Sequence, residues 1–95
     1  MSAYVLANVT VKEPVRYEEY RRLVTPTLEK HGGRFIVRGG AIEVLEGAWR
    51  PGRLVIIEFP SAERARAWWS SPEYTEAKLI RQATSDGTLV IVEGV

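Results

Sequence analysis

The sequence predicts an α+β fold in which one antiparallel sheet of four strands carries helices on one face. Four segments rich in β-branched and aromatic residues indicate the strands, and apolar residues at three- and four-residue spacing indicate the helices. Their order along the chain is strand-helix-strand-strand-helix-strand. This order is typical of the split βαβ arrangement of a ferredoxin-like sandwich. All 95 residues, 1–95, are expected to form a single domain.

The first predicted strand and the first predicted helix meet at Pro14. Residues 4–12 predict the strand, and Pro14 suits the first position of a helix that runs to Gly32-Gly33. Pro26 lies within this helix and lacks the backbone N–H that an interior residue donates, so we expect a kink or a break near Thr25. The inward stripe of this helix is expected to contain Tyr17, Tyr20, Leu23 or Val24, and Leu28.

The middle of the chain predicts two strands separated by a glycine-rich connection. Residues 34–38 predict the second strand, which Gly39-Gly40 ends, and residues 41–47 could continue as a short hairpin partner. Residues 53–60 carry the strongest strand signal in the chain and predict the third strand. These two strands are therefore expected to pair after a long turn.

The last predicted helix is interrupted. Ser61 and Ser71 are each placed to cap a helix, and Pro72 suits the first position of the second piece. Asp86-Gly87 then predicts a turn into a closing strand over residues 88–95. The inward stripe of the second piece is expected to contain Tyr74, Ala77 and Ile80.

Alternation along the strands divides their side chains between two faces of the sheet. One face is wholly apolar and is expected to meet the helices: Val5, Ala7, Val9, Val11, Phe35, Val37, Val55, Ile57, Phe59, Val90 and Val92. The other face is mixed: Leu6, Asn8, Thr10, Arg34, Ile36, Arg38, Leu54, Ile56, Glu58, Leu89, Ile91 and Glu93. Covering the large apolar side chains of the mixed face would contribute on the order of ten kcal/mol. We therefore expect a second copy of the sheet to cover it, which gives a homodimer with the architecture of a dimeric α/β barrel.

Composition excludes several classes of function. The formal net charge is only +1, so nucleic acid is not an expected partner. No apolar run approaches the length of a membrane span and no secretion signal is evident, so we expect a cytoplasmic protein without membrane contact. The absence of cysteine and the single histidine exclude disulfides and metal sites that need thiolates or two imidazoles. No cofactor or metal is expected.

Four segments together resemble the DUF1330 family, a family of domains of unknown function assigned to the dimeric α/β-barrel superfamily. They are GGRFIVRGG at 32–40, LEGAWRPGRLVIIEFPS at 45–61, WWSSPEYTEAKLIRQA at 68–83 and LVIVEG at 89–94. The resemblance extends over nearly the whole chain and implies the fold and a homodimer, but no reaction. Wider relatives in the superfamily include monooxygenases without cofactor, haem-degrading enzymes, small isomerases and stress-responsive proteins, so the fold alone does not assign a function.

Charged residues on or beside the predicted strands are the first candidate site. Arg34 and Arg38 could bind the acid group of a small organic molecule through their planar guanidinium groups, with Asn8 beside them. Glu58 or Glu46 could then act as an acid or base, and Glu58 is the candidate catalytic residue. The alternative is an ion-pair network at the dimer interface, which needs no ligand and uses the same residues.

Aromatic residues and the histidine are the second group of candidates. An aromatic wall of a ligand pocket could be formed by Trp49, Trp68, Trp69 and Tyr74, although packing in the core is the simpler interpretation for these residues. His31 could ligate haem, but its place before two glycines equally suits an interaction with the carboxyl end of a helix.

Two hypotheses of different classes therefore remain open at the level of sequence. The first is a homodimeric protein that binds, or acts on, a small anionic organic molecule in a pocket beside the sheet. The second is a noncatalytic structural or ligand-sensing dimeric module, whose charges only fix the interface. Haem binding through His31 is a weaker third hypothesis.

Overall fold

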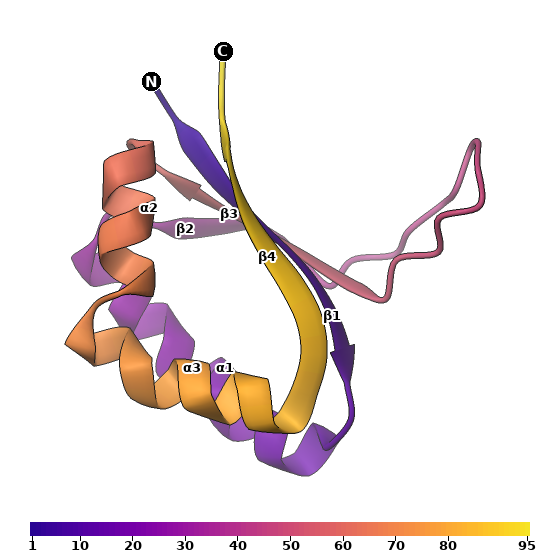
Figure 1. Cartoon of the computed structure of the whole chain (residues 1–95), viewed down its shortest axis with the longest axis horizontal. Helices are drawn as coiled ribbons and strands as arrows, with labels where there is room; N and C mark the ends of the chain where they lie inside the picture. The colour runs from indigo at the N-terminus through magenta and orange to yellow at the C-terminus, as the bar shows by residue number, and fades with distance from the viewer.

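The computed structural model describes residues 1–95 and confirms the predicted α+β fold (Figure 1). Its strands form one antiparallel sheet in the order β2-β3-β1-β4, and the helices gather on one side of it. The chain is therefore a ferredoxin-like sandwich of one sheet and one helical layer. The elements are β1 (Ala3–Val11), α1 (Pro14–Lys30), β2 (Arg34–Arg38), β3 (Arg53–Phe59), α2 (Ala62–Trp69), α3 (Pro72–Thr84) and β4 (Ser85–Glu93).

The interruption between α2 and α3 is confirmed, and serines cap both helices. The Ser61 hydroxyl accepts a hydrogen bond from the backbone N–H of Arg64 at 3.2 Å. The Ser71 hydroxyl accepts one from the backbone N–H of Tyr74 at the same distance. Each cap satisfies a donor that the first turn of a helix leaves free, so the chain restarts helix α3 at a defined angle.

The expected break in α1 is wrong, because this helix continues through Pro26 to Lys30. Proline removes one backbone hydrogen bond from the helix. Val24, Thr27 and Leu28 surround it in the sequence and are all buried against the rest of the protein. The packing of these three residues offsets the lost hydrogen bond. The local sequence alone does not show this tertiary packing.

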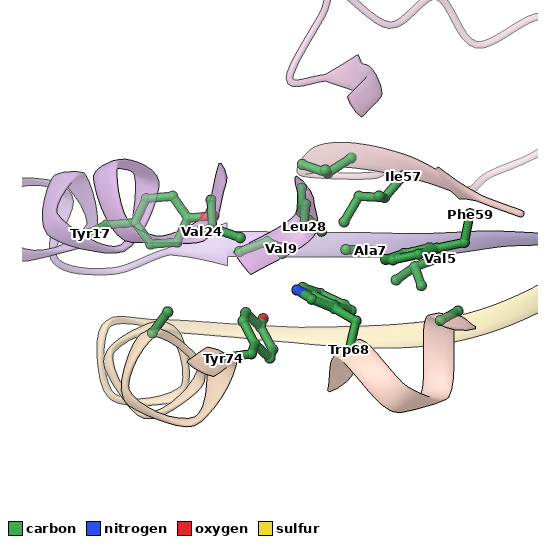
Figure 2. Packing of buried hydrophobic residues seen from close by; sticks show 13 residues of the cluster. Val5, Ala7, Val9, Tyr17, Val24, Leu28, Ile57, Phe59, Trp68 and Tyr74 are labelled. Atoms are coloured by element: carbon green, nitrogen blue, oxygen red, sulfur yellow. The ribbon is translucent and has the colours of Figure 1, made fainter. Parts of the chain in front are cut away.

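The core lies between the helical layer and the sheet, and Trp68 is at its centre. Its ring is fully buried, 5.5 Å from the Phe59 ring centre and 4.1 Å from that of Tyr74. Its indole N–H donates a hydrogen bond to the Thr27 hydroxyl at 3.0 Å. Figure 2 shows Trp68 and Tyr74 between the helices and the valines of β1. The core therefore ties α1, α2 and α3 to one face of the sheet.

The prediction of which β4 side chains face the helices is wrong. Leu89 pairs with Ala7 and Ile91 with Val5, so they share the helix-covered face, while Val90 and Val92 lie on the opposite, outer face. The expected turn at Asp86-Gly87 is also absent, because both residues pair with β1 at the start of β4. The run Leu-Val-Ile-Val is apolar at every position and carries no alternation, so only its register with β1 decides which side chains face inward.

The expected facing is also wrong for the second half of β2. Phe35 pairs with Ile57, but a bulge shifts the register so that Val37 pairs with Ile56 and Arg38 with Val55. The extra residue in the bulge moves Val37 to the outer face and Arg38 to the helix-covered face.

The segment after β2 also differs from expectation. Residues 41–47 form no strand, and the connection of residues 39–52 extends away from the sheet (Figure 1).

No helix is both long enough and apolar enough to cross a membrane.

Candidate functional site

A small cavity lies between the helical layer and the sheet. The space open to a water molecule inside it is about 20 Å³, room for about one water. No carboxylate and no imidazole line it, although four guanidinium groups and two phenols do. The polar lining is Tyr17, Tyr20, Arg21, Arg38, Arg53 and Arg81, and the rest is apolar. We call this space the arginine cavity.

The four arginines reach the cavity from four different elements. Arg21 comes from α1, Arg81 from the last turn of α3, and Arg38 and Arg53 from the paired strands β2 and β3. Gly39 has a φ of 72°, and a Cβ at this position would overlap the Arg53 guanidinium. Glycine is therefore needed here both for the backbone conformation and for the close approach of Arg53.

Like charges crowd the guanidinium of Arg38. It lies 4.1 Å from the centre of the Phe35 ring and donates a hydrogen bond to the carbonyl of Arg21 at 3.2 Å. Burial, and then the charges of Arg21 and Arg53, lower the pKa of Arg38 below its ordinary value. Arg38 therefore sits in a positive field, although part of its side chain remains exposed to solvent.

Most of these charges lack an acidic partner. Arg21 pairs with Glu18 at 3.1 Å, whereas Arg38, Arg53 and Arg81 make no salt bridge. The Nε atoms of Arg21 and Arg53 are buried without a hydrogen-bond partner. Buried polar groups are nearly always paired, so these donors require an explanation.

Tyrosines extend the same network into the core. Arg81 is 7% exposed, and its Nε donates a hydrogen bond to the Tyr74 hydroxyl at 3.3 Å. The hydroxyls of Tyr74 and Tyr20 are 3.1 Å apart. Burial raises the pKa of Tyr17 and raises that of Tyr20 strongly. Both phenols therefore stay protonated at neutral pH, and each O–H is available as a donor.

Residues 2–95 match the family described as a domain of unknown function, DUF1330. The chain belongs to this family. No curated protein matches the chain. Among solved structures it is similar to RPA0582, a protein of unknown function from Rhodopseudomonas palustris, at 23% identity with a TM-score of 0.80, over 99% of this chain and 82% of that one.

Two further solved structures share the fold of this DUF1330 domain at lower identity. One is SnoaB, a cofactor-independent oxygenase from Streptomyces nogalater, at 14% identity with a TM-score of 0.68, over 99% of this chain and 93% of that one. The other is Rv0793 from Mycobacterium tuberculosis, at 12% identity with a TM-score of 0.62, over 100% of this chain and 96% of that one. At these identities the similarity shows the fold alone.

The predicted charged residues separate into two places in the DUF1330 domain. Arg38 lines the arginine cavity, but Arg34 and Glu58 pair with each other on the outer face. Nη2 of Arg34 lies 2.6 Å from Oε1 of Glu58, and its Nε donates to the same oxygen at 2.7 Å. Tyr4 also donates to Glu58, at 3.4 Å, and the side-chain oxygen of Asn8 accepts a bond from the N–H of Gly52 at 3.0 Å. Glu58 therefore makes contacts within the sheet, and Asn8 makes a contact with the connection of residues 39–52.

The remaining candidate site residues of the DUF1330 domain also lie in different places. Tyr74 joins the network behind the arginine cavity, as described above. Glu46 and Trp49 lie in the exposed connection of residues 39–52, and Trp49 is 60% exposed. His31 follows the last turn of α1, with its Nε2 3.6 Å from a carboxylate oxygen of Glu73, and it lines none of the pockets.

Sequence reasoning missed Arg53, Arg81 and Arg21 as cavity residues, although signals for two of them were present. Arg53 has the same alternation as Val55, which was expected to face the helices. Arg81 is seven residues after Tyr74, a helical spacing that places both on one face. Because charged side chains usually face solvent, these arginines were not expected inside the protein. Only the structure shows that they line a cavity.

The Arg34–Glu58 pair predicts an acid-dependent loss of stability. Its hydrogen bond with Arg34 lowers the pKa of Glu58 below its ordinary value. A lowered folded-state pKa gives stability that is present above the unfolded pKa and is lost as the pH falls through the folded one. Glu58→Gln should therefore reduce the free energy of unfolding, measured with urea, at about pH 7 but not at about pH 2. Glu76→Gln, at an exposed glutamate without an ion pair, is the control, and an equal effect of Glu58→Gln at both pH values would contradict the prediction.

Proposed function

We propose that this DUF1330 domain binds the acid group of a small organic anion in the arginine cavity and works as a homodimer. The observation that supports this proposal is that Arg38, Arg53 and Arg81 gather around one cavity without an acidic partner. A bound carboxylate supplies the missing charge and accepts the free N–H donors. Arginine suits this role because its planar guanidinium can donate two parallel hydrogen bonds to a carboxylate.

The cost of burying Arg81 among like charges is the reason to expect a ligand. A buried charge without a partner is expensive, and neighbouring like charges add to that cost. Arg81 is 93% buried, since only 7% of it is exposed, and its one side-chain hydrogen bond is to a neutral phenol. A protein gains stability from whatever ligand neutralises such a cluster, because binding to the folded state alone shifts the folding equilibrium.

The lining of the cavity supports binding more than proton-transfer chemistry. A general base near neutral pH needs a carboxylate or an imidazole within reach of the substrate, and the arginine cavity has neither. The tyrosines have raised pKa values, so they are donors and not bases. Glu58, the catalytic candidate from the sequence, lies on the outer face and is occupied by Arg34. The proposal is therefore a binding function.

The outer face of the sheet supports the homodimer. It carries apolar side chains that no helix covers, and several are largely exposed, with Val90 at 51% and Val92 at 46%. A sheet face open to water is normally mostly polar. The apolar residues of the outer face are Leu6, Val37, Leu54, Ile56, Val90 and Val92. A second copy of the same face is the proposed cover, and the single domain is proposed to work in this form in the cytoplasm.

Butyrate is the probe that tests the binding proposal. The Nε–H groups of Arg21 and Arg53 have no partner in the structure, so their NMR signals should move when butyrate enters. The Nε–H of Arg34 already donates to Glu58, so its signal should stay. Arg38→Met should weaken butyrate binding by about tenfold or more, because it removes a charged donor from the site.

Arg34→Met is the matched control for that experiment, because it removes an arginine of the same sheet outside the cavity. It should leave the butyrate affinity within about twofold of wild type. Titration of butyrate without movement of the Arg53 signal, or equal affinity in Arg38→Met, would contradict the arginine cavity as the binding site.

A further inference from the structure

A long groove runs along the edge strand β4 on the helix-covered side of the sheet. Its apolar part has a volume of about 250 Å³ and is lined by Val5, Trp69, Leu89, Val90 and Ile91. Its polar part, of about 370 Å³, lies at the junction of α3 and β4, which follow each other directly (Figure 1). Trp69 and Leu89 line both parts, so the two lie next to each other. We call this the β4 groove.

The β4 groove adjoins the arginine cavity. Arg81 lines both the polar part of the groove and the cavity, and Leu89 lines the cavity and both parts of the groove. Arg81 therefore stands between a wide groove and a space that holds only about one water. A space of this size admits at most the acid group of a ligand, so a larger organic body has to lie outside it.

The groove has the composition and size of a site for such a body. Ligand pockets are mostly apolar, measure a few hundred Å³ and carry a few placed polar groups. Trp69 is held in position by Lys78, whose ammonium lies 3.8 Å from its ring centre and donates to its carbonyl at 3.0 Å. The negative charge of Asp86 in the polar part is offset by Lys12, 2.8 Å away. Arg81 is thus the group in the groove that selects for an anion.

We infer that the ligand is an elongated amphiphilic acid, with its carboxylate at the arginines and an apolar body along β4 against Trp69, Leu89 and Ile91. This inference rests on the proposed function and adds the chemical class of the ligand. Gly87, at the polar part, and Ile91, at the apolar part, are four residues apart on β4. At about 3.4 Å per residue these positions are about 14 Å apart, a length that suits the body of a medium-chain fatty acid or an aryl-alkanoic acid.

Octanoate, butyrate and octylamine separate the contributions of body and charge. Octanoate should bind the full-length protein at least about 30-fold more tightly than butyrate, because its extra methylene groups leave water for the groove. Octylamine has the same body with a positive charge and should not bind. Isothermal titration calorimetry gives the affinities, and the part of the tryptophan quenching that Trp69→Ala abolishes reports on Trp69, one of three tryptophans.

Variants in the groove test its role without touching the arginines. Ile91→Ser and Trp69→Ala, both at partly exposed side chains, should weaken octanoate binding about tenfold and leave butyrate unchanged. Trp49→Ala, at an exposed tryptophan of the 39–52 connection, is the matched control and should change neither affinity.

The outcomes distinguish this inference from the proposed function. Butyrate binding that depends on Arg38, with octanoate no tighter and Ile91→Ser without effect, overturns the amphiphilic ligand and keeps the anion site. Failure of both acids to bind overturns both. If Ile91→Ser or Trp69→Ala instead dissociates a dimer while octanoate has no effect on oligomeric state or fluorescence, the groove is a contact between copies and the inference is wrong.

Discussion

Replacing Trp68 with alanine is expected to lower the free energy of unfolding by about 3–5 kcal/mol. The ring is fully buried between Phe59 and Tyr74, and its removal leaves a cavity that these neighbours cannot fill. It also leaves the Thr27 hydroxyl without the indole donor that reaches it at 3.0 Å. Urea unfolding followed by circular dichroism gives the free energy directly.

The adjacent residue provides the control for that experiment. Trp69 is 44% exposed and its ring lies against the ammonium of Lys78, so Trp69→Ala should cost less than about 1 kcal/mol. The two substitutions remove the same side chain from neighbouring positions of one helix. Equal losses for both would contradict the arrangement of α2, in which one tryptophan faces the core and the next faces the β4 groove.

Introducing a carboxylate on the outer face is expected to have the second large effect. Ile56 lies in the third strand, opposite Leu6 and Val37, in the middle of the proposed dimer interface. Ile56→Asp would bury a charge without a partner in that interface, so the protein should become mostly monomeric, or unfold if the monomer is unstable. Sedimentation velocity measures the oligomeric state, and circular dichroism separates a folded monomer from an unfolded chain.

Val15→Asp is the control, because Val15 is 87% exposed on α1, away from the outer face. This variant should sediment as wild type does. A wild-type protein that is monomeric at micromolar concentration, or an Ile56→Asp variant that remains fully dimeric, would contradict the proposed homodimer.

The sequence predicted the elements of the fold better than the facing of their side chains. Periodicity and caps were enough to locate the helices, as the serine caps of α2 and α3 show, although not to predict that α1 continues through Pro26. The facing of β4 was not predictable because its residues are apolar on both sides and its register depends on β1. The facing of Arg38 was not predictable because a bulge in β2 changes the alternation without any glycine or proline to mark it.

The site was predicted in kind and only partly in position. Of the candidate residues, Arg38 lies at the arginine cavity, whereas Tyr74 is buried in the core and does not line the cavity. Arg34 and Glu58 looked equally suitable in sequence, but cross-strand pairing on the outer face joins them to each other. Three of the cavity arginines come from other elements, and no local pattern reports that α1, α3 and β3 meet at one point.

The most direct test of the arginine cavity is a crystal structure of the protein with 8-bromooctanoate, read from the anomalous signal of the bromine. We expect the carboxylate within hydrogen-bond distance of Arg53 or Arg81, and the bromine in the β4 groove near Trp69 and Ile91. A carboxylate bound at Arg34 on the outer face, with the arginine cavity unoccupied, would contradict the account.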